Sequence, residues 1–322
     1  MVKKENRLPR EIWAAAISLK GLWPEETIDK RIKAVLQRME SLYPFVPDII
    51  CLPETVNTSW VKENKTLEEI AEDEEVPGPV SGIFADVAKK HNCYILCPVI
   101  TKKDGQFFNS SILINRKGTI DGVSHKVHPT TGEIDRGTYY QGGGVTPGVL
   151  RPPVFKTDFG TVGMQICMDA SYYDSWHSLK EDGAEVILFS SQASYKSKLS
   201  HFSWLNNYYI VSSTGEDARI IDINGEVITE DGEFARWVCA PMNLEKELLH
   251  IWPHTLKFDK IREKYGRGIR FNVSHPENFA TIESLHPDIK VKDILREFNI
   301  PNYDEHIREA TDIQNRYRLG SE

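Results

Sequence analysis

The stretch that decides the fold reads TVGMQICMD and runs from Thr161 to Asp169. Its apolar first part has the length of a buried β-strand, and this strand ends at a cysteine, Cys167. Residues 172–181 follow with helical spacing, and residues 185–190 again read as a buried strand. An order of strand, helix and strand is typical of an α/β fold.

The same alternation continues outward along the chain. Strands are expected over residues 12–17, 48–52 and 94–100, with helices over residues 27–42 and 82–91 between them. Two turn signals, Lys103-Asp104-Gly105 and Asn224-Gly225, each separate a pair of strand-like runs and predict hairpins. The sequence therefore predicts an α/β fold with a mixed sheet or sheets covered by helices.

Composition excludes several function classes. The chain has 322 residues, of which 40% are hydrophobic and 27% charged, as in ordinary soluble globular proteins. Its net charge of -8 provides no overall basic field for nucleic acid. No apolar run approaches the roughly 18 residues that a membrane-spanning helix needs. The N-terminal residues lack the apolar segment of a secretory signal, so we expect a cytoplasmic location and no membrane partner.

The five cysteines favour free thiols. Their odd number, without a secretory signal, argues against a disulfide framework and for a reducing compartment. Cys93 and Cys97 have the spacing of zinc ligands, but no second pair matches them. We expect these two thiols to be buried in the core, and we expect no metal site.

Three polar residues stand out because each follows a probable strand. Glu54 comes after the strand over residues 48–52, Lys126 after a run over residues 118–123, and Cys167 after the opening stretch. Ligands in open α/β sheets gather beyond the carboxyl ends of strands. A thiol, a carboxylate and an ammonium group suffice for acyl transfer, as nucleophile, base and oxyanion stabiliser. Taken singly, each residue is explained more simply by a structural position: a buried core thiol, a helix cap or turn, or a solvated surface lysine. Only the three together indicate a catalytic site.

The local context of these residues resembles the nitrilase superfamily of carbon–nitrogen hydrolases. The matching segments are Leu52-Pro53-Glu54, the run from Lys126 to Glu133, and Gly163 with Ile166-Cys167-Met168-Asp169. The resemblance extends from about residue 12 to about residue 229. It implies a four-layer α-β-β-α sandwich of two mixed β-sheets, followed here by a C-terminal extension.

The resemblance also implies a mechanism without metal or cofactor. By position, Cys167 is the nucleophile and Glu54 is the general base. Lys126 stabilises the oxyanion together with the backbone N–H of Met168. Glu133 corresponds to a second glutamate that positions the substrate and Lys126. The expected partner is a small-molecule amide, carbamoyl or nitrile substrate.

Two segments disagree about the substrate. Nitrilases of the superfamily carry Trp-Glu directly after the nucleophile, whereas this chain has Met168-Asp169, which favours a linear amide or N-carbamoyl compound. Pro129-Thr130 and Glu133 look more like nitrilases. We give more weight to Met168, whose backbone lies beside the reacting carbon, and keep a nitrilase as the alternative. A catalytically silent metabolite-binding or scaffold homologue and an N-acyltransferase also remain open.

Candidates for substrate contacts are less specific. Ser191 or Gln192 could hydrogen-bond the substrate, and Tyr139 could line the pocket, although surface positions explain these residues as well. His125 and His128 flank Lys126 and read as hydrogen-bonding residues. Residues 68–75 hold six acids, which we expect to form a solvated loop or, alternatively, to lie at the pocket mouth.

The positions of the three segments also define the domains. Since they must converge, residues 8–252 are expected to form one hydrolase domain. Residues 253–322 carry equal numbers of basic and acidic residues, and only 291–298 reads clearly as a helix. We expect this part to be an arm that packs on the domain or on a neighbouring subunit of a homodimer or higher homo-oligomer.

Overall fold

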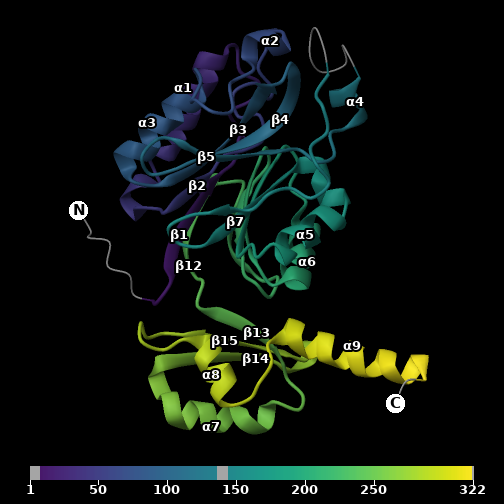
Figure 1. The fold of residues 1–322 in the computed structure, drawn as a ribbon. Helices are drawn as coiled ribbons and strands as arrows, with labels where there is room; N and C mark the ends of the chain where they lie inside the picture. The colour runs from purple at the N-terminus through teal and green to yellow at the C-terminus, as the bar shows by residue number, and fades with distance from the viewer. Residues whose placement is uncertain (1–7, 136–143, 321–322) are drawn as a thin grey trace. The chain divides into compact units, whose positions relative to one another are not determined.

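The chain forms two compact units. The computed structural model describes residues 8–135 and 144–320, drawn in colour in Figure 1. Among these, the first unit comprises residues 13–242, and the second comprises residues 243–320 with the short stretch 8–12.

The first unit is built on two six-stranded sheets. The first sheet has the strand order β12-β1-β2-β3-β4-β5, with bounds Trp237–Asn243, Glu11–Ile17, Ile49–Cys51, Tyr94–Lys103, Gln106–Ile114 and Ile120–His125. The second has the order β11-β10-β9-β8-β7-β6, with bounds Val227–Asp231, Ala218–Ile221, Tyr209–Thr214, Val186–Ser191, Thr161–Ile166 and Phe155–Lys156. Both sheets are mixed, because β1, β2 and β3 pair in parallel, as do β7, β8 and β9, while antiparallel strands flank them.

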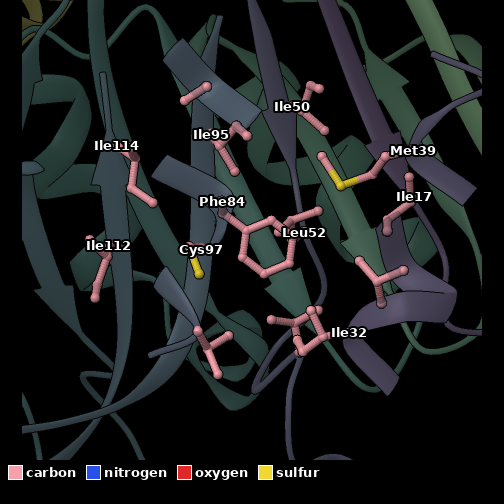
Figure 2. Packing of buried hydrophobic residues seen from close by; sticks show 14 of the residues in the cluster. Ile17, Ile32, Met39, Ile50, Leu52, Phe84, Ile95, Cys97, Ile112 and Ile114 are labelled. Carbon is pink, nitrogen blue, oxygen red and sulfur yellow. The ribbon is translucent and has the colours of Figure 1, made fainter. Parts of the chain in front are cut away.

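Helices cover the outer face of each sheet (Figure 1). Helices α1 (Ile28–Met39) and α3 (Ser81–His91) pack on the first sheet. Helices α5 (Asp174–Glu181) and α6 (Lys196–Asn206) pack on the second. Figure 2 shows the first of these cores, in which helix side chains meet strand side chains: Ile32, Met39 and Phe84 from the helices, Ile17, Ile50, Ile95, Cys97, Ile112 and Ile114 from the strands, and Leu52 directly after β2.

The inner faces of the two sheets contact each other. The Cys51 Sγ atom lies 3.7 Å from the Phe189 carbonyl oxygen, and the Ser111 and Ser190 hydroxyl oxygens are 3.3 Å apart. These residues belong to different sheets and are completely buried. The predicted four-layer α-β-β-α sandwich of two mixed sheets is therefore confirmed.

Local signals in the sequence explain the element boundaries. Thr27 caps α1, since its side chain accepts a hydrogen bond from the Lys30 backbone N–H. Asp104 and Gly105 both have positive φ, 49° and 76°, which is the conformation that a two-residue hairpin turn between β3 and β4 requires. The short helices α2 (Leu67–Ile70) and α4 (Thr131–Ile134) each begin with a capping box.

The acidic segment 68–75 is not a solvated loop throughout. Glu72 is buried, and its carboxylate accepts hydrogen bonds from the Val80 and Ser81 backbone N–H groups at the start of α3. Glu74 lies 2.6 Å from the His125 Nε2 atom. The expectation of a solvated loop is wrong for these two residues, because backbone and side-chain donors compensate the burial of their charges.

The second unit has a sheet and a core of its own. Its strands follow the order β13-β15-β14, with bounds Lys246–His250, Phe279–Ser284 and Ile269–Ser274. Helices α7 (Thr255–Tyr265), α8 (Val291–Glu297) and α9 (Tyr303–Leu319) accompany them, and Phe258, Ile282 and Ile294 are buried in the core. The sequence places a boundary after residue 252 and expects an arm. The structure differs, because β13 pairs with β15 and so joins this unit. Packing on the domain or on a neighbouring subunit stays a prediction.

A cluster of three histidines predicts pH-dependent stability of the second unit. His254 is buried, its Nε2 atom lies 3.4 Å from the His306 Nδ1 atom, and the His306 ring stacks on His250. Burial, His306, Lys257 and His250 lower the pKa of His254 from 6.5 to about 4. Between these two pH values His254 is protonated in the unfolded chain but neutral in the folded unit. The free energy of unfolding should therefore fall as the pH drops from about 6.5 toward about 4.

Urea denaturation of wild type and His254→Gln at several pH values measures this effect. The variant should lose less stability than the wild type over that pH range. His201→Gln, an exposed histidine of the first unit, is the control and should follow the wild type. Identical pH profiles for all three proteins would contradict the prediction.

Candidate active site

Glu54 lies just beyond β2 with its carboxylate held by three donors. Its Oε1 atom accepts hydrogen bonds from Lys126 Nζ at 2.7 Å and from Asn109 Nδ2 at 2.9 Å. Its Oε2 atom accepts from the Gln192 backbone N–H at 3.1 Å. Only 4% of the residue is exposed, so these donors fix the carboxylate in one orientation inside the protein.

Lys126 follows β5 and lies between two carboxylates. Its Nζ atom donates to Glu54 Oε1 and to both oxygens of Glu133, at 3.0 and 2.8 Å. Burial alone lowers the pKa of Lys126, but the charges of Glu54 and Glu133 and the hydrogen bond with Glu133 outweigh it, so the pKa is raised. The side chain therefore stays a cation within this site.

The Glu133 carboxylate both caps the helix α4 and pairs with the Lys126 ammonium group. As the third residue of α4, it accepts a hydrogen bond from the Thr130 backbone N–H at 2.7 Å in the capping box. The same carboxylate binds Lys126 and accepts from Asn109 Nδ2 at 2.8 Å. Burial raises the pKa of Glu133, but these partners lower it more, so the group remains ionised.

Cys167 lies directly after β7, at the start of a 3₁₀ turn over residues 167–171. Its backbone has a φ of 45°, in the left-handed region that a side chain with a Cβ rarely adopts. Burial and the Glu54 charge raise the pKa of its thiol to about 11, although Lys126 and hydrogen bonds with Ser191 and Gln192 oppose this. In the resting protein at neutral pH the thiol is thus protonated beside a carboxylate.

The four residues predicted as catalytic meet in one pocket. The pocket has a volume of about 660 Å³ and is lined by Glu54, Lys126, Glu133 and Cys167. One wall consists of residues 58–65, an irregular segment between β2 and α2. The geometry therefore brings a thiol, a base and a cation together around a space that a small molecule can occupy.

The predicted substrate contacts have different outcomes. Gln192 lines the pocket, and its side-chain Nε2 atom donates to the Glu54 carbonyl oxygen at 2.7 Å. Ser191 is completely buried and interacts with the Cys167 thiol. Met168 follows Cys167 in the 3₁₀ turn, and its role as a backbone donor stays a prediction. Tyr139 lies outside the described residues.

Asp169 connects the 3₁₀ turn that begins at Cys167 with the loop that contains Lys126 and His128, called the lysine loop below. It is almost completely buried, and its Oδ1 atom accepts from the His128 backbone N–H at 2.7 Å. Its Oδ2 atom accepts from the Ile166 backbone N–H at 3.0 Å. The His128 ring stacks on Tyr172 with 3.6 Å between ring centroids. Asp169, which the sequence analysis names both in the matching segment and as a departure from nitrilases, thus links the turn at Cys167 by hydrogen bonds to the loop that follows Lys126.

Asn109 of β4 is the site residue that the sequence analysis missed. One amide nitrogen donates to both Glu54 and Glu133, and only 1% of the residue is exposed. Asn109 also holds the lysine loop through its main chain, since its backbone carbonyl oxygen accepts a hydrogen bond from the Lys126 backbone N–H at 2.8 Å. The one available signal was a polar amide directly after the apolar pair Phe107-Phe108 within β4.

Replacing Asn109 by leucine should lower kcat without unfolding the protein. A hydrogen bond to a charged group contributes about 1.5–3 kcal/mol, which corresponds to roughly a 10- to 100-fold loss. Steady-state kinetics on the best substrate measure the effect. Asn115→Leu is the matched control, because Asn115 hydrogen-bonds in the exposed turn after β4 and should leave kcat unchanged. A kcat equal to that of the wild type in Asn109→Leu would contradict this role.

Within residues 8–135 and 144–320, no three His, Cys, Asp or Glu side chains gather in an arrangement that could hold a metal ion. His125 and His128, the candidates nearest to Lys126, contact Glu74 and Asp169 instead. Over the same ranges, no helix has both the length and the apolar character needed to cross a membrane.

Comparison with known sequences finds carbon-nitrogen hydrolases. A family model described as carbon-nitrogen hydrolase matches residues 24–244. The chain is 29% identical to a β-ureidopropionase of Arabidopsis thaliana over 146 residues, which cover 44% of this chain and 34% of that protein. It is 26% identical to a deaminated glutathione amidase of Synechocystis over 162 residues, which cover 44% of this chain and 60% of that protein. The matches thus span a third to three fifths of these curated relatives.

Solved structures share the fold. NitFhit of C. elegans superposes with a TM-score of 0.62 at 16% identity, covering 81% of this chain and 66% of that one. An amidase from Nesterenkonia superposes with a TM-score of 0.60 at 11% identity, covering 74% and 92%. These identities are low, so the superpositions show the architecture alone. Because the family model matches more than half of the chain, the protein belongs to the carbon-nitrogen hydrolase family.

Proposed function

We propose that this protein hydrolyses a non-peptide C–N bond in a small linear amide or N-carbamoyl compound, with Cys167 as the nucleophile. The observation that carries the proposal is the protonated Cys167 thiol in one pocket with the Glu54 carboxylate, which three donors hold in place. A neutral thiol needs a base at hand before it can attack a carbonyl carbon. Glu54 has the position and the chemistry of such a base.

The first half-reaction forms a thioester. Glu54 accepts the thiol proton as the sulfur attacks the carbonyl carbon, and the carbonyl oxygen becomes an oxyanion. Lys126 and the Met168 backbone N–H stabilise that oxyanion. When the intermediate collapses, the C–N bond breaks and Glu54 returns the proton to the leaving nitrogen. Ammonia departs from an amide, and an amine departs from an N-carbamoyl compound.

The second half-reaction releases the acid. Glu54 takes a proton from water, the hydroxide oxygen attacks the thioester carbon, and the C–S bond breaks. The proton then returns to the Cys167 sulfur. An amide substrate yields a carboxylic acid, whereas a carbamoyl thioester yields carbamic acid, which decomposes to carbon dioxide and ammonia.

A substrate panel tests the proposal. Linear amides, N-carbamoyl amines and nitriles are incubated separately with the protein, and released ammonia or amine is measured beside the intact mass of the chain. We expect turnover and an acyl or carbamoyl mass increment with members of the first two classes. The increment should vanish in Cys167→Ala and persist in Cys239→Ala, since Cys239 is a half-buried thiol that does not line the pocket.

The other outcomes separate the alternatives. Product from nitriles alone would identify a nitrilase and overturn the amide assignment. Transfer of the acyl group to an added amine in preference to water would identify an acyltransferase. No turnover and no increment with any class would favour a metabolite-binding or scaffold protein.

A further inference from the structure

Tyr195, the residue directly before α6, has a strained backbone. Its φ is 48°, in the left-handed region that side chains with a Cβ rarely adopt. Its carbonyl oxygen accepts a hydrogen bond from the Leu199 backbone N–H at 3.0 Å, so Tyr195 is fixed at the start of the helix. Such residues tend to gather at functional sites, where the surrounding structure holds them in place. Tyr195 shares this conformation with Cys167, whose φ is 45°.

The register of two parallel strands brings Tyr195 near Cys167. Ile166 of β7 pairs with Ser190 of β8, so Cys167 and Ser191 are the next residues along the two strands. The Ser191 side chain hydrogen-bonds with the Cys167 thiol. Tyr195 follows Ser191 after a three-residue loop, residues 192–194. The chain therefore returns past the nucleophile just before α6 begins.

Two side-chain contacts orient the Tyr195 ring. The ring lies edge-on to Phe189 of β8, with 6.1 Å between ring centroids. The Lys198 Nζ atom lies 5.3 Å from the centre of the Tyr195 ring and donates to Ser171 Oγ at 3.2 Å. Ser171 is the last residue of the 3₁₀ turn that begins at Cys167. The ring is thus held between the core of the second sheet and the turn that carries the nucleophile.

The Tyr195 hydroxyl group makes a hydrogen bond with the Cys167 thiol. Burial and this hydrogen bond raise the pKa of Tyr195, although Lys126 opposes them. The phenol therefore keeps its proton at neutral pH, so its O–H is the donor and the sulfur is the acceptor. Tyr195 is not among the residues that line the pocket, which leaves the substrate space in front of the sulfur open.

We propose that Tyr195 is a catalytic residue whose hydroxyl group stabilises the Cys167 sulfur whenever that atom carries negative charge. The inference rests on the proposed function. In the first half-reaction the thiol proton passes to Glu54 as the C–S bond forms. In the second, the electron pair of the breaking C–S bond returns to the sulfur before the proton does. Hydrogen bonds to ionised acceptors are roughly twice as strong as neutral ones, so the donor acts mainly at these two points. Tyr195 keeps its own proton throughout.

Labelling of Cys167 with iodoacetamide, followed by peptide mass spectrometry, tests this role without any substrate. Tyr195→Phe keeps the ring and removes the hydroxyl group, so the pKa of the thiol should rise. The thiolate fraction should fall about 10- to 100-fold, partly offset because a more basic thiolate is a better nucleophile. Labelling at pH 8 should therefore slow by roughly 3- to 10-fold. Glu54 and Lys126, whose charges also act on the thiol, are unchanged in this variant.

Tyr173→Phe is the matched control for the loss of a hydroxyl group. The Tyr173 hydroxyl contacts His177 Nδ1 at 3.2 Å in an exposed position, so this variant should label at the wild-type rate. If Tyr195→Phe does not fold, 3-fluorotyrosine in place of Tyr195 replaces it. This side chain keeps the ring and is a stronger donor, so labelling should be faster than in the wild type. Unchanged labelling in whichever protein is used would overturn the proposal.

Steady-state kinetics separate a role at the sulfur from a role in substrate binding. On a substrate that the wild type turns over, Tyr195→Phe should lower kcat by roughly 10-fold and leave KM unchanged, because Tyr195 does not line the pocket. A raised KM with an unchanged kcat would overturn the role at the sulfur. Lack of turnover by the wild type would instead refute the proposed function, and the labelling rates distinguish that failure from failure of this inference.

Discussion

Cys167→Ala should hydrolyse its best substrate at least about 10⁴-fold more slowly than the wild type, as expected when a covalent nucleophile is removed. Without the sulfur no thioester can form, and the remaining groups only bind and polarise the substrate. Because the fold needs no charge at this position, the variant should keep wild-type stability. Initial rates and urea denaturation on the same preparation separate loss of chemistry from loss of structure.

The control for this prediction is another partly accessible thiol. Cys239→Ala should retain full activity, since Cys239 belongs to β12 and is absent from the pocket lining. Full activity in Cys167→Ala would refute thiol catalysis. Equal losses in both variants would point to a general effect of removing cysteine rather than to the nucleophile.

Lys126→Met should lower kcat by about 10²–10³-fold and destabilise the fold by about 3–5 kcal/mol at neutral pH. The first effect follows from loss of the cation that faces the oxyanion. The second follows because Glu54 and Glu133 are left buried without their shared partner. Kinetics and urea denaturation measure both. The deficit in stability should shrink as the pH falls, because the Glu133 carboxyl, no longer held ionised by Lys126, can take up a proton.

The rate at which iodoacetamide alkylates Cys167 provides an independent test, because substitutions of Lys126 and Glu54 should change it in opposite directions. Lys126 lowers the pKa of the Cys167 thiol and Glu54 raises it. Lys126→Met should therefore slow labelling of Cys167 at neutral pH, and Glu54→Gln should accelerate it, although both variants lose turnover. Labelling rates that change in the same direction would show that these two charges do not act on the thiol as the geometry requires.

The parts of the fold that the sequence predicted are those with local signals. Residues 12–17 and 49–51 are continuous apolar runs, and β1 and β2 occupy them. The elements β14 and β15 were missed because each is a six-residue run in which apolar and polar residues mix, and α9 was missed because it buries none of its residues. The formation of β14 and β15 depends on the small core around Phe258 and Ile282, which brings together residues far apart in the chain.

The residues of the candidate site also fall into those that the sequence predicted and those that it did not. Glu54, Lys126 and Cys167 stood in recognisable contexts at strand ends, and Glu133 stood in the segment that follows Lys126. Asn109 had none, since its partners come from distant segments and only the folded chain brings them to one amide group. The pocket wall was equally unpredictable. Trp60, for example, holds a left-handed φ of 58°, and its indole nitrogen donates to Gln192 Oε1, 132 residues away.

The left-handed backbone at Cys167 bears on how such a protein evolves. A residue with a Cβ in this conformation costs about 1–2 kcal/mol, which glycine would recover. A protein on this fold that did not need the thiol would gain stability from a single substitution there, and no catalytic requirement would oppose it. Folding alone therefore does not explain a cysteine at this strained turn, whereas the proposed nucleophile does, and a glycine there would be compatible with the fold but not with that chemistry.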